Sequence, residues 1–406
     1  MSFERFIAKH FLPKDHNHFA GPLVEIATYS IALGVVVMIM AVSILRGFQN
    51  EISRKVVGFG SHIVVNSYQM ANAFEETPIS INRPEVSKIK NLPEVRHIQY
   101  FANKGGMIKT DDQIQGFMMK GVDKGFDTTF FAENIVDGRL FRFDDSAASN
   151  EVVISKTMSD KLDIAVGDRL KTYFWQGDNY RARAFTVVGL YNTDLTAFDD
   201  IYIVGDIRQI QKINGWTDDQ VAGYEILIRN FEQLDNAYES VMSTLDYDLT
   251  AQTIVMQNLS LFSWLELLDS NIVLILSIMA IVCIVSIVSS LLIMIFEKTS
   301  TIGVLKTLGA TNTSIRKIFM HKALQIILKG VVIGNAAAFV LCFLQYRYKI
   351  ISLDSSSYSM STVPIDLNAG IFILVSIFTI AVCVTTLLIP TSYISKIDPA
   401  KTIKIE

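Results

Sequence analysis

The sequence predicts an α-helical membrane protein with four transmembrane helices and one large α/β domain inserted between the first and second helices. Half of the 406 residues are hydrophobic and only 19% are charged, whereas soluble chains are about a quarter charged. Four long runs hold most of the apolar residues, and a stretch of about 220 residues separates the first two runs. The composition therefore argues against a wholly soluble enzyme and against a secreted module held together by disulfides.

The four apolar runs each have about 20 or more residues with almost no charge, the length that crosses a bilayer core. They cover residues 26–48, 272–296, 323–346 and 370–390. The first run ends in Leu45, Arg46 and Gly47 rather than at a small-residue cleavage site, so we interpret it as an anchor and not as a signal peptide. The three cysteines all lie inside these runs, so no disulfide framework is expected.

The orientation follows from the distribution of Lys and Arg. Basic residues gather in the N-terminal lead, in the link between the second and third runs, and in the C-terminal tail. The segment between the first two runs has about 32 acidic against about 21 basic residues. We therefore expect both termini to be cytoplasmic and the large segment to lie outside.

These observations divide the chain into nine predicted parts. They are a cytoplasmic amphipathic helix over 1–22, spans over 23–48, 270–296, 323–346 and 370–391, the outer α/β domain over 49–269, a cytoplasmic region over 297–322, a short outer loop over 347–369 and a cytoplasmic tail over 392–406.

The sequence predicts an α/β fold for the outer segment, which is large enough to contain two subdomains. Alternating or β-branched patterns predict strands over 61–68, 95–101, 113–122, 151–154, 170–175, 182–191, 201–204 and 224–228. Capping and periodicity predict helices over 84–92, 155–162, 206–213 and 231–245. The last part, 256–269, is expected to be helical and continuous with the second span.

The sequence contains no recognisable catalytic set, cofactor motif or metal site. No Gly-Lys-Ser/Thr sequence occurs, so a P-loop is excluded. Acidic doublets place neighbouring side chains on different faces, which is typical of solvated surface. The run from Asp15 to His18 lacks a third clear metal ligand. We predict neither an enzyme nor a nucleic-acid binder.

Small residues follow one face of the third run, where Gly330 and Gly334 form a Gly-x-x-x-Gly pattern. Such a face allows close helix packing, either within the chain or against another subunit, and the sequence does not choose between them. In the N-terminal lead, Phe3, Phe6, Ile7 and Phe11 recur at helical spacing, which favours an amphipathic helix on the membrane surface over a disordered tail.

The link between the second and third runs predicts a short helix, a turn and a second helix. Apolar residues recur at helical spacing on either side of Gly309 and Ala310, and Thr311 or Asn312 suits a new helix N-terminus. The segment is either a mere connector or a docking element for a cytoplasmic protein.

Several motifs resemble those of FtsX-like ABC transporter permeases. Residues 302–310 (IGVLKTLGA) are similar to a signature of that superfamily, and residues 397–403 (IDPAKTI) are similar to its C-terminal pattern. Residues 6–12 (FIAKHFL), 44–48 (ILRGF) and 185–189 (FTVVG) resemble the lipoprotein-releasing LolC/LolE branch, whose outer part is a MacB-like periplasmic core. The resemblance extends over essentially the whole chain.

The resemblance implies a non-catalytic subunit in the bacterial inner membrane, paired with a second permease subunit as a homodimer or heterodimer. A separate cytoplasmic LolD-like ATPase would drive it, and lipoproteins, membrane lipids and a periplasmic LolA-like carrier would be its other partners. ATP-driven motion would pass through the spans to the outer domain by mechanotransmission. The residues expected to couple to the ATPase are Ile302, Gly303, Leu305, Lys306, Leu308 and Gly309.

Two further sites follow from the resemblance. A lipid-binding cavity would be walled by Met38, Met40, Ile44, Phe48, Leu267, Leu268 and Ile272, although core packing would explain the same residues. A carrier-binding hairpin would present Phe174, Trp175, Tyr180, Arg181 and Arg183, residue types that anchor interfaces, although an ordinary hairpin folded onto the sheet is an equal alternative.

Two alternative functions stay open within this superfamily. One is a MacB-like efflux permease that acts on peptides or toxins without a carrier-binding hook. The other is an FtsX-like regulator that relays force to a periplasmic hydrolase. The partner that each would bind distinguishes them: a lipoprotein carrier, an outer-membrane channel or a wall hydrolase.

Overall fold

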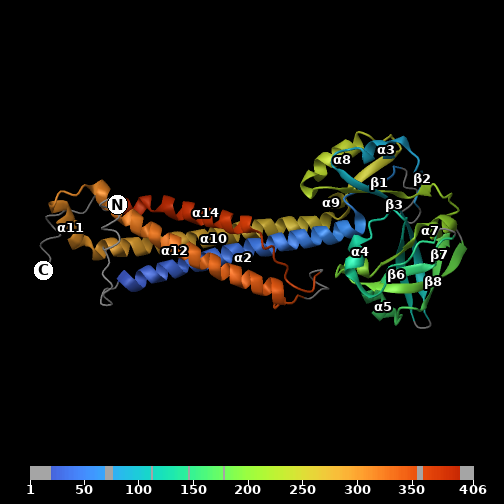
Figure 1. The fold of residues 1–406 in the computed structure, drawn as a ribbon, viewed down its shortest axis with the longest axis horizontal. Coiled ribbons are helices and arrows are strands. Elements are labelled where there is room, and N and C mark those ends of the chain that lie inside the picture. Colours follow the sequence, from blue (N-terminus) through green and yellow to red (C-terminus); the bar gives the residue numbers. More distant parts are fainter. Residues whose placement is uncertain are drawn as a thin grey trace. The chain divides into compact units, whose positions relative to one another are not determined.

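A computed structural model describes residues 20–68, 76–110, 113–144, 147–176, 179–353 and 360–393. The chain forms two compact units (Figure 1). The first, which we call the membrane unit, comprises Met1–Gln49, Trp264–Ser352 and Val363–Glu406. The second, the outer unit, comprises Asn50–Ser263 and Leu353–Thr362. The predicted N-terminal helix over 1–22 and the tail over 392–406 lie almost entirely outside the described residues.

In the part of the chain that the structure describes, four helices are long and apolar enough to cross a membrane, as predicted. They are α2 (Ala20–Gly60), α10 (Leu259–Glu297), α12 (Asn312–Tyr348) and α14 (Ala369–Thr386). Two short helices accompany them, α11 (Thr299–Thr307) before α12 and α15 (Leu388–Tyr393) after α14.

Three helix boundaries differ from the sequence prediction. Helix α2 does not end near Phe48 but continues to Gly60. The residues that follow Phe48 are more polar, yet Ile52, Val56 and Phe59 recur on one side and are buried, so the helix gains an apolar face there. Helix α10 begins at Leu259, after a break at Asn258 (φ −123°, ψ 43°) that separates it from α9 (Ile254–Gln257). The predicted second cytoplasmic helix is the start of the single helix α12.

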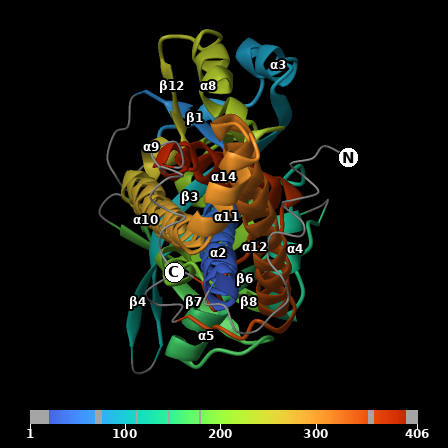
Figure 2. The ribbon, with the colours of Figure 1, turned by 90° about the vertical axis from the view of Figure 1, so that its left-hand side faces the viewer.

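Close contacts at glycine hold the membrane helices together, with α2 between α10 and α12 (Figure 2). A Cβ built on Gly34 would lie 2.6 Å from Sγ of Cys283 on α10. A Cβ on Gly330 would lie 2.9 Å from Cβ of Ile31, and one on Gly334 would lie 2.8 Å from Cβ of Val35. The Gly-x-x-x-Gly face of α12 is therefore used within the chain, against α2.

The outer unit is β-rich rather than evenly α/β, because most of its residues in regular structure form one ten-stranded sheet. Its strands are β1 (Ile63–Ser67), β3 (Val95–Lys109), β4 (Ile114–Val122), β5 (Ile135–Gly138), β6 (Glu151–Ser155), β7 (Arg169–Gln176), β8 (Asn179–Tyr191), β9 (Tyr202–Asp206), β11 (Gly223–Ile228) and β12 (Leu249–Thr253). A separate pair joins β2 (Ile79–Ser80) to β10 (Gln220–Val221).

Part of this sheet closes on itself. Strands β3, β4, β9, β6, β8 and β7 pair in that order, and β7 pairs with β3 as well as with β8. These six strands form a closed ring, and the side chain of Phe174 on β7 lies inside it. The centroid of the Phe174 phenyl group is 5.5 Å from that of Phe117 and 6.2 Å from that of Phe185. Strands β11, β1 and β12 extend the sheet beyond β3, and β5 adds to β8.

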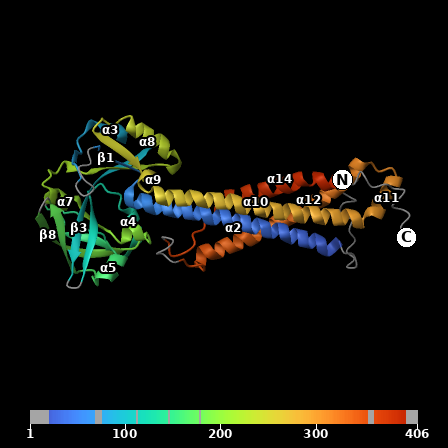
Figure 3. The ribbon, with the colours of Figure 1, turned by 180° about the vertical axis from the view of Figure 1, so that it is seen from behind.

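Short helices cover the sheet and form two groups (Figure 3). They are α3 (Pro84–Lys90), α4 (Thr129–Asn134), α5 (Lys156–Leu162), α6 (Thr196–Asp199), α7 (Ile207–Asn214), the 3-10 turn η1 (Phe231–Gln233) and α8 (Leu234–Met242). Helices α3 and α8 lie beside β1, whereas α5 and α7 lie beside the ring. Side-chain caps start three of them. Oγ of Ser155 accepts from the Met158 amide, the Asp206 carboxylate accepts from the Arg208 amide, and Oδ1 of Asn230 accepts from the Glu232 amide.

Candidate functional site

Helix α11 lies between α10 and α12 and has a defined cap at its C-terminus. It ends in a left-handed glycine, Gly309 (φ +92°), with the Ala310 amide donating to the Leu305 carbonyl and the Gly309 amide to the Lys306 carbonyl. This is the Schellman arrangement that ends a helix sharply. Oγ1 of Thr311 accepts from the Ser314 amide at 3.2 Å and starts α12, as the sequence predicted.

The residues predicted to couple to an ATPase do not all face outward. Ile302 and Gly303 are buried, and Ile302 belongs to the core that joins the membrane helices, so these two residues hold α11 in place. Leu305 and Lys306 are half-buried, and Leu305 packs against the same core. Leu308 is 79% exposed, and Gly309 is exposed beside it.

Val304 is a member of the outward face that the sequence analysis missed. It is 49% exposed and lies one turn before Leu308, so the two side chains share a face. The i, i+4 spacing of two apolar residues was the available signal, but the spacing could not tell the outward face from the inward one. An apolar pair that is exposed on a capped helix suits contact with another protein.

The β7–β8 hairpin divides its aromatic residues between two faces. Its strands pair as predicted, from Arg169 opposite Thr186 to Gln176 opposite Asn179, and the two turn residues lie outside the described part. Phe174 is fully buried inside the ring, so the expectation that it is exposed is wrong. Successive strand residues point to opposite faces, and Trp175 therefore lies on the outer face.

On that outer face, Trp175 and Tyr180 form one exposed aromatic pair. They are 54% and 52% exposed and pack edge to face with ring centroids 4.8 Å apart. Arg181 is exposed but donates to the Lys212 carbonyl at 3.1 Å, and Arg183 is half-buried. The exposed part of the predicted carrier-binding surface is therefore smaller than the five residues that the sequence predicted.

The predicted cavity residues also separate. Met38 is fully buried among the membrane helices, so it is not on an outer wall. The helical spacing of Ile31, Val35 and Met38 places it on the packed stripe of α2. The other predicted wall residues are half-buried, except Leu267, which is 65% exposed: Met40, Ile44, Phe48, Leu268 and Ile272.

Within the membrane unit, the ends of α2 and α10 are joined beside these residues. The Gln49 amide donates to the Asp269 carboxylate at 3.0 Å, and the rings of Phe48 and Trp264 pack edge to face at 6.4 Å. An intramolecular partner therefore covers part of Phe48.

The outer unit holds buried charges that the sequence analysis did not select. Nζ of Lys55 lies 3.7 Å from the Asp194 carboxylate, and Lys55 is itself buried on α2. Burial raises the pKa of the nearby Asp199 to about 6. Burial, together with the charge of Arg96, lowers the pKa of His62 to about 4. Among the described residues, no three His, Cys, Asp or Glu side chains are grouped as metal ligands would be.

Two family models match the chain. The MacB-like periplasmic core domain matches residues 26–242, and the FtsX-like permease C-terminal region matches residues 273–399. The first match covers more than half of the chain.

Relatives align over almost the full length. The chain is 22% identical, over an alignment 424 positions long, to the lipoprotein-releasing system transmembrane protein LolC of Neisseria meningitidis, covering 100% of both chains. It is 24% identical, over an alignment 409 positions long, to the corresponding LolE of Haemophilus influenzae, covering 96% of this chain and 95% of that protein.

Solved structures of outer domains are also similar. The periplasmic region of MacB from Actinobacillus actinomycetemcomitans covers 51% of this chain and 95% of its own, with 11% identity and a TM-score of 0.34. The extracellular domain of the ABC-type transporter YknZ from Gram-positive bacteria covers 47% and 99%, with 13% identity and a TM-score of 0.32.

Proposed function

The chain belongs to the family of FtsX-like ABC transporter permeases with a MacB-like periplasmic core domain, similar to LolC and LolE, and from this we propose that it is the permease subunit of a lipoprotein-releasing system. It extracts lipoproteins from the inner membrane and passes them to a periplasmic carrier. The observation that carries this proposal is the similarity to LolC and LolE over the whole chain, both spans and outer domain.

Energy for this work comes from a separate LolD-like ATPase in the cytoplasm. Helix α11 is the docking element in this proposal, because its inward residues pack on the membrane core while Val304 and Leu308 present apolar surface. Burial of an exposed apolar pair by a partner protein contributes favourable binding free energy. Motion of the ATPase would then reach the membrane helices through Ile302 and the core around it.

A second permease subunit completes the assembly in this proposal. Helix α10 supports it, because it is the most apolar of the four candidate spans and only 17% of its most apolar stretch is buried within the chain. The acyl chains of the substrate would lie against the half-buried and exposed residues of α2 and α10, including Ile44 and Leu267. Both termini are cytoplasmic and the outer unit is periplasmic in this arrangement.

Depletion of the protein tests the function directly. Outer-membrane lipoproteins should accumulate in the inner membrane when the protein is depleted, and re-expression of the wild-type chain should restore their sorting. Normal sorting under depletion would refute the proposal. Cross-linking in the same strain then identifies the partner: a lipoprotein carrier supports release, whereas an outer-membrane channel or a wall hydrolase indicates a MacB-like or FtsX-like role.

A further inference from the structure

Helix α12 carries nitrogen-bearing side chains on one stripe near the end that follows α11. Lys322, Gln325 and Lys329 are spaced i, i+3 and i+7, so they lie on one side of the helix. Gln325 and Lys329 are exposed, and Lys322 is half-buried. The stripe borders the buried face of α12, which contains Ile326 and Gly330. These three side chains are therefore available to a molecule that lies against the outside of the membrane unit.

Lys329 lies inside the apolar run of α12 and not at its border. It is about 9 Å of helix beyond Ala323, where the run over 323–346 starts. A charged side chain at that depth of a membrane is costly unless it reaches water, a headgroup or an opposite charge. The long stem of a lysine allows its ammonium group to lie nearer the membrane surface than its Cα does. The charge of Lys329 is therefore expected on the side of Lys322, at the polar end of the stripe.

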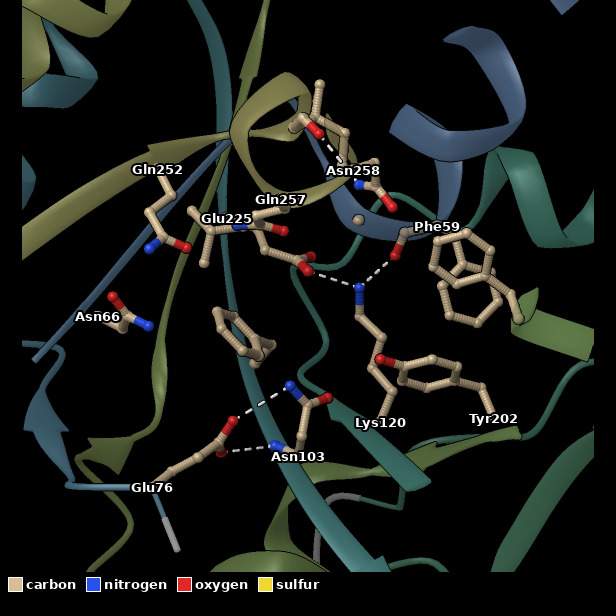
Figure 4. A pocket seen from close by; sticks show the side chains of 15 residues that line it. Phe59, Asn66, Glu76, Asn103, Lys120, Tyr202, Glu225, Gln252, Gln257 and Asn258 are labelled. Atoms are coloured by element: carbon tan, nitrogen blue, oxygen red, sulfur yellow. Dashed lines mark hydrogen bonds and ion pairs between the residues drawn. The ribbon is translucent and has the colours of Figure 1, made fainter. Parts of the chain in front are cut away.

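Neither lysine of the stripe has an acidic partner, unlike a lysine in the core of the outer unit. Beside a cavity in that unit, Nζ of Lys120 lies 2.5 Å from Oε1 of Glu225 and also donates to the Phe59 carbonyl (Figure 4). In the part of the chain that the structure describes, no carboxylate lies within ion-pair distance of Lys322 or Lys329. Their charges are thus not compensated by the described residues.

The two positive charges of the stripe also repel one another, since Lys322 and Lys329 are close enough to interact. The neighbouring helix α2 does not relieve this repulsion. Its Thr28 carbonyl lies 2.9 Å from the position of a Cβ on Gly330, and Glu25 precedes Thr28 by about one turn. Glu25 is exposed, and it forms no ion pair with either lysine. Two like charges at the edge of an apolar medium attract an anion from outside the chain.

Beyond Lys329 the same side of α12 is apolar and exposed. Val332 is 67% exposed and Val340 is 53% exposed, and Ala336 and Phe343 between and after them are exposed as well. These residues continue the spacing of three and four residues that the polar part of the stripe has. A molecule on the stripe therefore meets N–H donors at one end and an apolar surface along about 20 Å of helix beyond them.

We propose that this stripe binds an anionic phospholipid, with the phosphate between Lys322 and Lys329 and the acyl chains along Val332 and Val340. Two ammonium groups and the Gln325 amide supply N–H donors and no negative charge, which suits the acceptor oxygens of a phosphate. A zwitterionic headgroup brings its own cation towards the lysines, and a free phosphate leaves the apolar part of the stripe uncovered. The leaflet rests on the proposed function, which places this end of α12 on the cytoplasmic side, where anionic headgroups attract basic residues.

Native mass spectrometry of the full-length protein in detergent, with the partners that co-purify, tests the proposal. Dioleoyl phosphatidylglycerol is the probe, and dioleoyl phosphatidylethanolamine is the matched lipid with the same acyl chains. Since each lysine near a headgroup contributes about fivefold in affinity, phosphatidylglycerol should bind about 25-fold more tightly. Inorganic phosphate should not displace it. The measurement needs neither ATP nor a lipoprotein, so its failure leaves the proposed function standing, and failure of the depletion experiment leaves the lipid site standing.

Variants of α12 connect lipid binding to the stripe. Lys322→Gln and Lys329→Gln should each weaken phosphatidylglycerol binding about fivefold, and together they should abolish the preference for this lipid. Lys329→Arg should retain the preference, because it keeps the charge. Lys317→Gln is the matched control, since Lys317 is exposed on another side of the same helix.

Four results would overturn the proposal. They are equal affinity of the wild type for the two lipids, a preference that survives in the double variant, displacement of phosphatidylglycerol by inorganic phosphate, and a carbodiimide cross-link in the membrane that joins Lys329 to a carboxylate of another protein. The third result would indicate a site for a free anion, and the fourth would indicate a protein partner.

Discussion

Replacing Leu308 by aspartate should separate ATPase docking from folding of the permease. Leu308 is 79% exposed, and substitutions at exposed positions change stability by no more than about 0.5 kcal/mol, with about 0.3–1 kcal/mol more for an acidic group at a helix C-terminus. The variant should therefore insert into the membrane and purify like the wild type.

The expected loss of binding free energy at the ATPase interface is larger than this change in folding stability. Complete burial of a leucine side chain contributes about 1.5–3 kcal/mol, so docking has about 1.2–2.4 kcal/mol to gain from the exposed part of Leu308. Since about 1.4 kcal/mol is a factor of ten, the Kd for the ATPase should rise about 7- to 50-fold in Leu308→Asp. Desolvation of the new carboxylate adds to this loss.

The assay measures the ATPase that co-purifies with the wild-type chain, first by pull-down and then by titration in nanodiscs. Tyr247→Asp is the matched control, because Tyr247 is also an exposed apolar residue and lies in the outer unit. Ile302→Asp is unsuitable, since a charge buried in the membrane core would unfold the subunit. An unchanged Kd in Leu308→Asp, or no ATPase bound to the wild type, would refute the docking role of α11.

Three further predictions concern helix packing, backbone conformation and the pH dependence of stability. Gly334→Leu should destabilise the membrane unit by about 1–3 kcal/mol, because its Cβ would lie 2.8 Å from Cβ of Val35 on α2; the melting temperature in detergent measures this. Gly309→Ala should lower stability by about 1 kcal/mol, because φ is +92° although a Cβ meets nothing within 4 Å. His62 has a folded-state pKa of about 4, below its unfolded value of 6.5, so protonation favours unfolding. The His62 contribution is complete above pH 6.5 and decreases as the pH falls towards 4, by up to about 3 kcal/mol.

Each of these predictions has its own control. Ala337→Leu places the same side chain on the exposed face of α12, and an equal loss of stability there would show that the α2 contact is not responsible. Gly116→Ala has open space and no positive φ, so the same penalty at both glycines would contradict the conformational explanation. His62→Gln should flatten the pH dependence relative to the wild type, a comparison that cancels the opposite contributions of Glu76 and Asp199, whose pKa values burial raises; identical curves would refute the assignment.

Local chemistry made several elements predictable. The run of apolar residues in each candidate span leaves only a helix able to satisfy the backbone in lipid. Gly309 allows a left-handed residue and Thr311 provides a hydroxyl, so the end of α11 and the start of α12 follow from residues within a few positions of each other. Ser155 predicts the start of α5 for the same reason.

Other features depend on partners far away in the chain. The β7 sequence contains two adjacent aromatic residues, and alternation alone allows either to be inside; ring closure between β3 and β7 buries Phe174 and leaves Trp175 outside. The buried ion pair between Lys120 and Glu225 joins strands β4 and β11, which are far apart in the sequence. No local pattern identifies Glu225 as the partner of Lys120.

The four apolar helices, the capped turn after α11 and most strands could be predicted, because each depends on hydrophobicity and backbone preferences within a short segment. Which of their faces are covered depends on contacts between distant segments. Such contacts bury Ile52, Val56 and Phe59, and α2 therefore continues to Gly60. They also bury Ile302 while Leu308 stays exposed, and they pack Gly330 and Gly334 against α2. Burial is a property of contacts between distant segments, and spacing along one segment cannot specify the segment it meets.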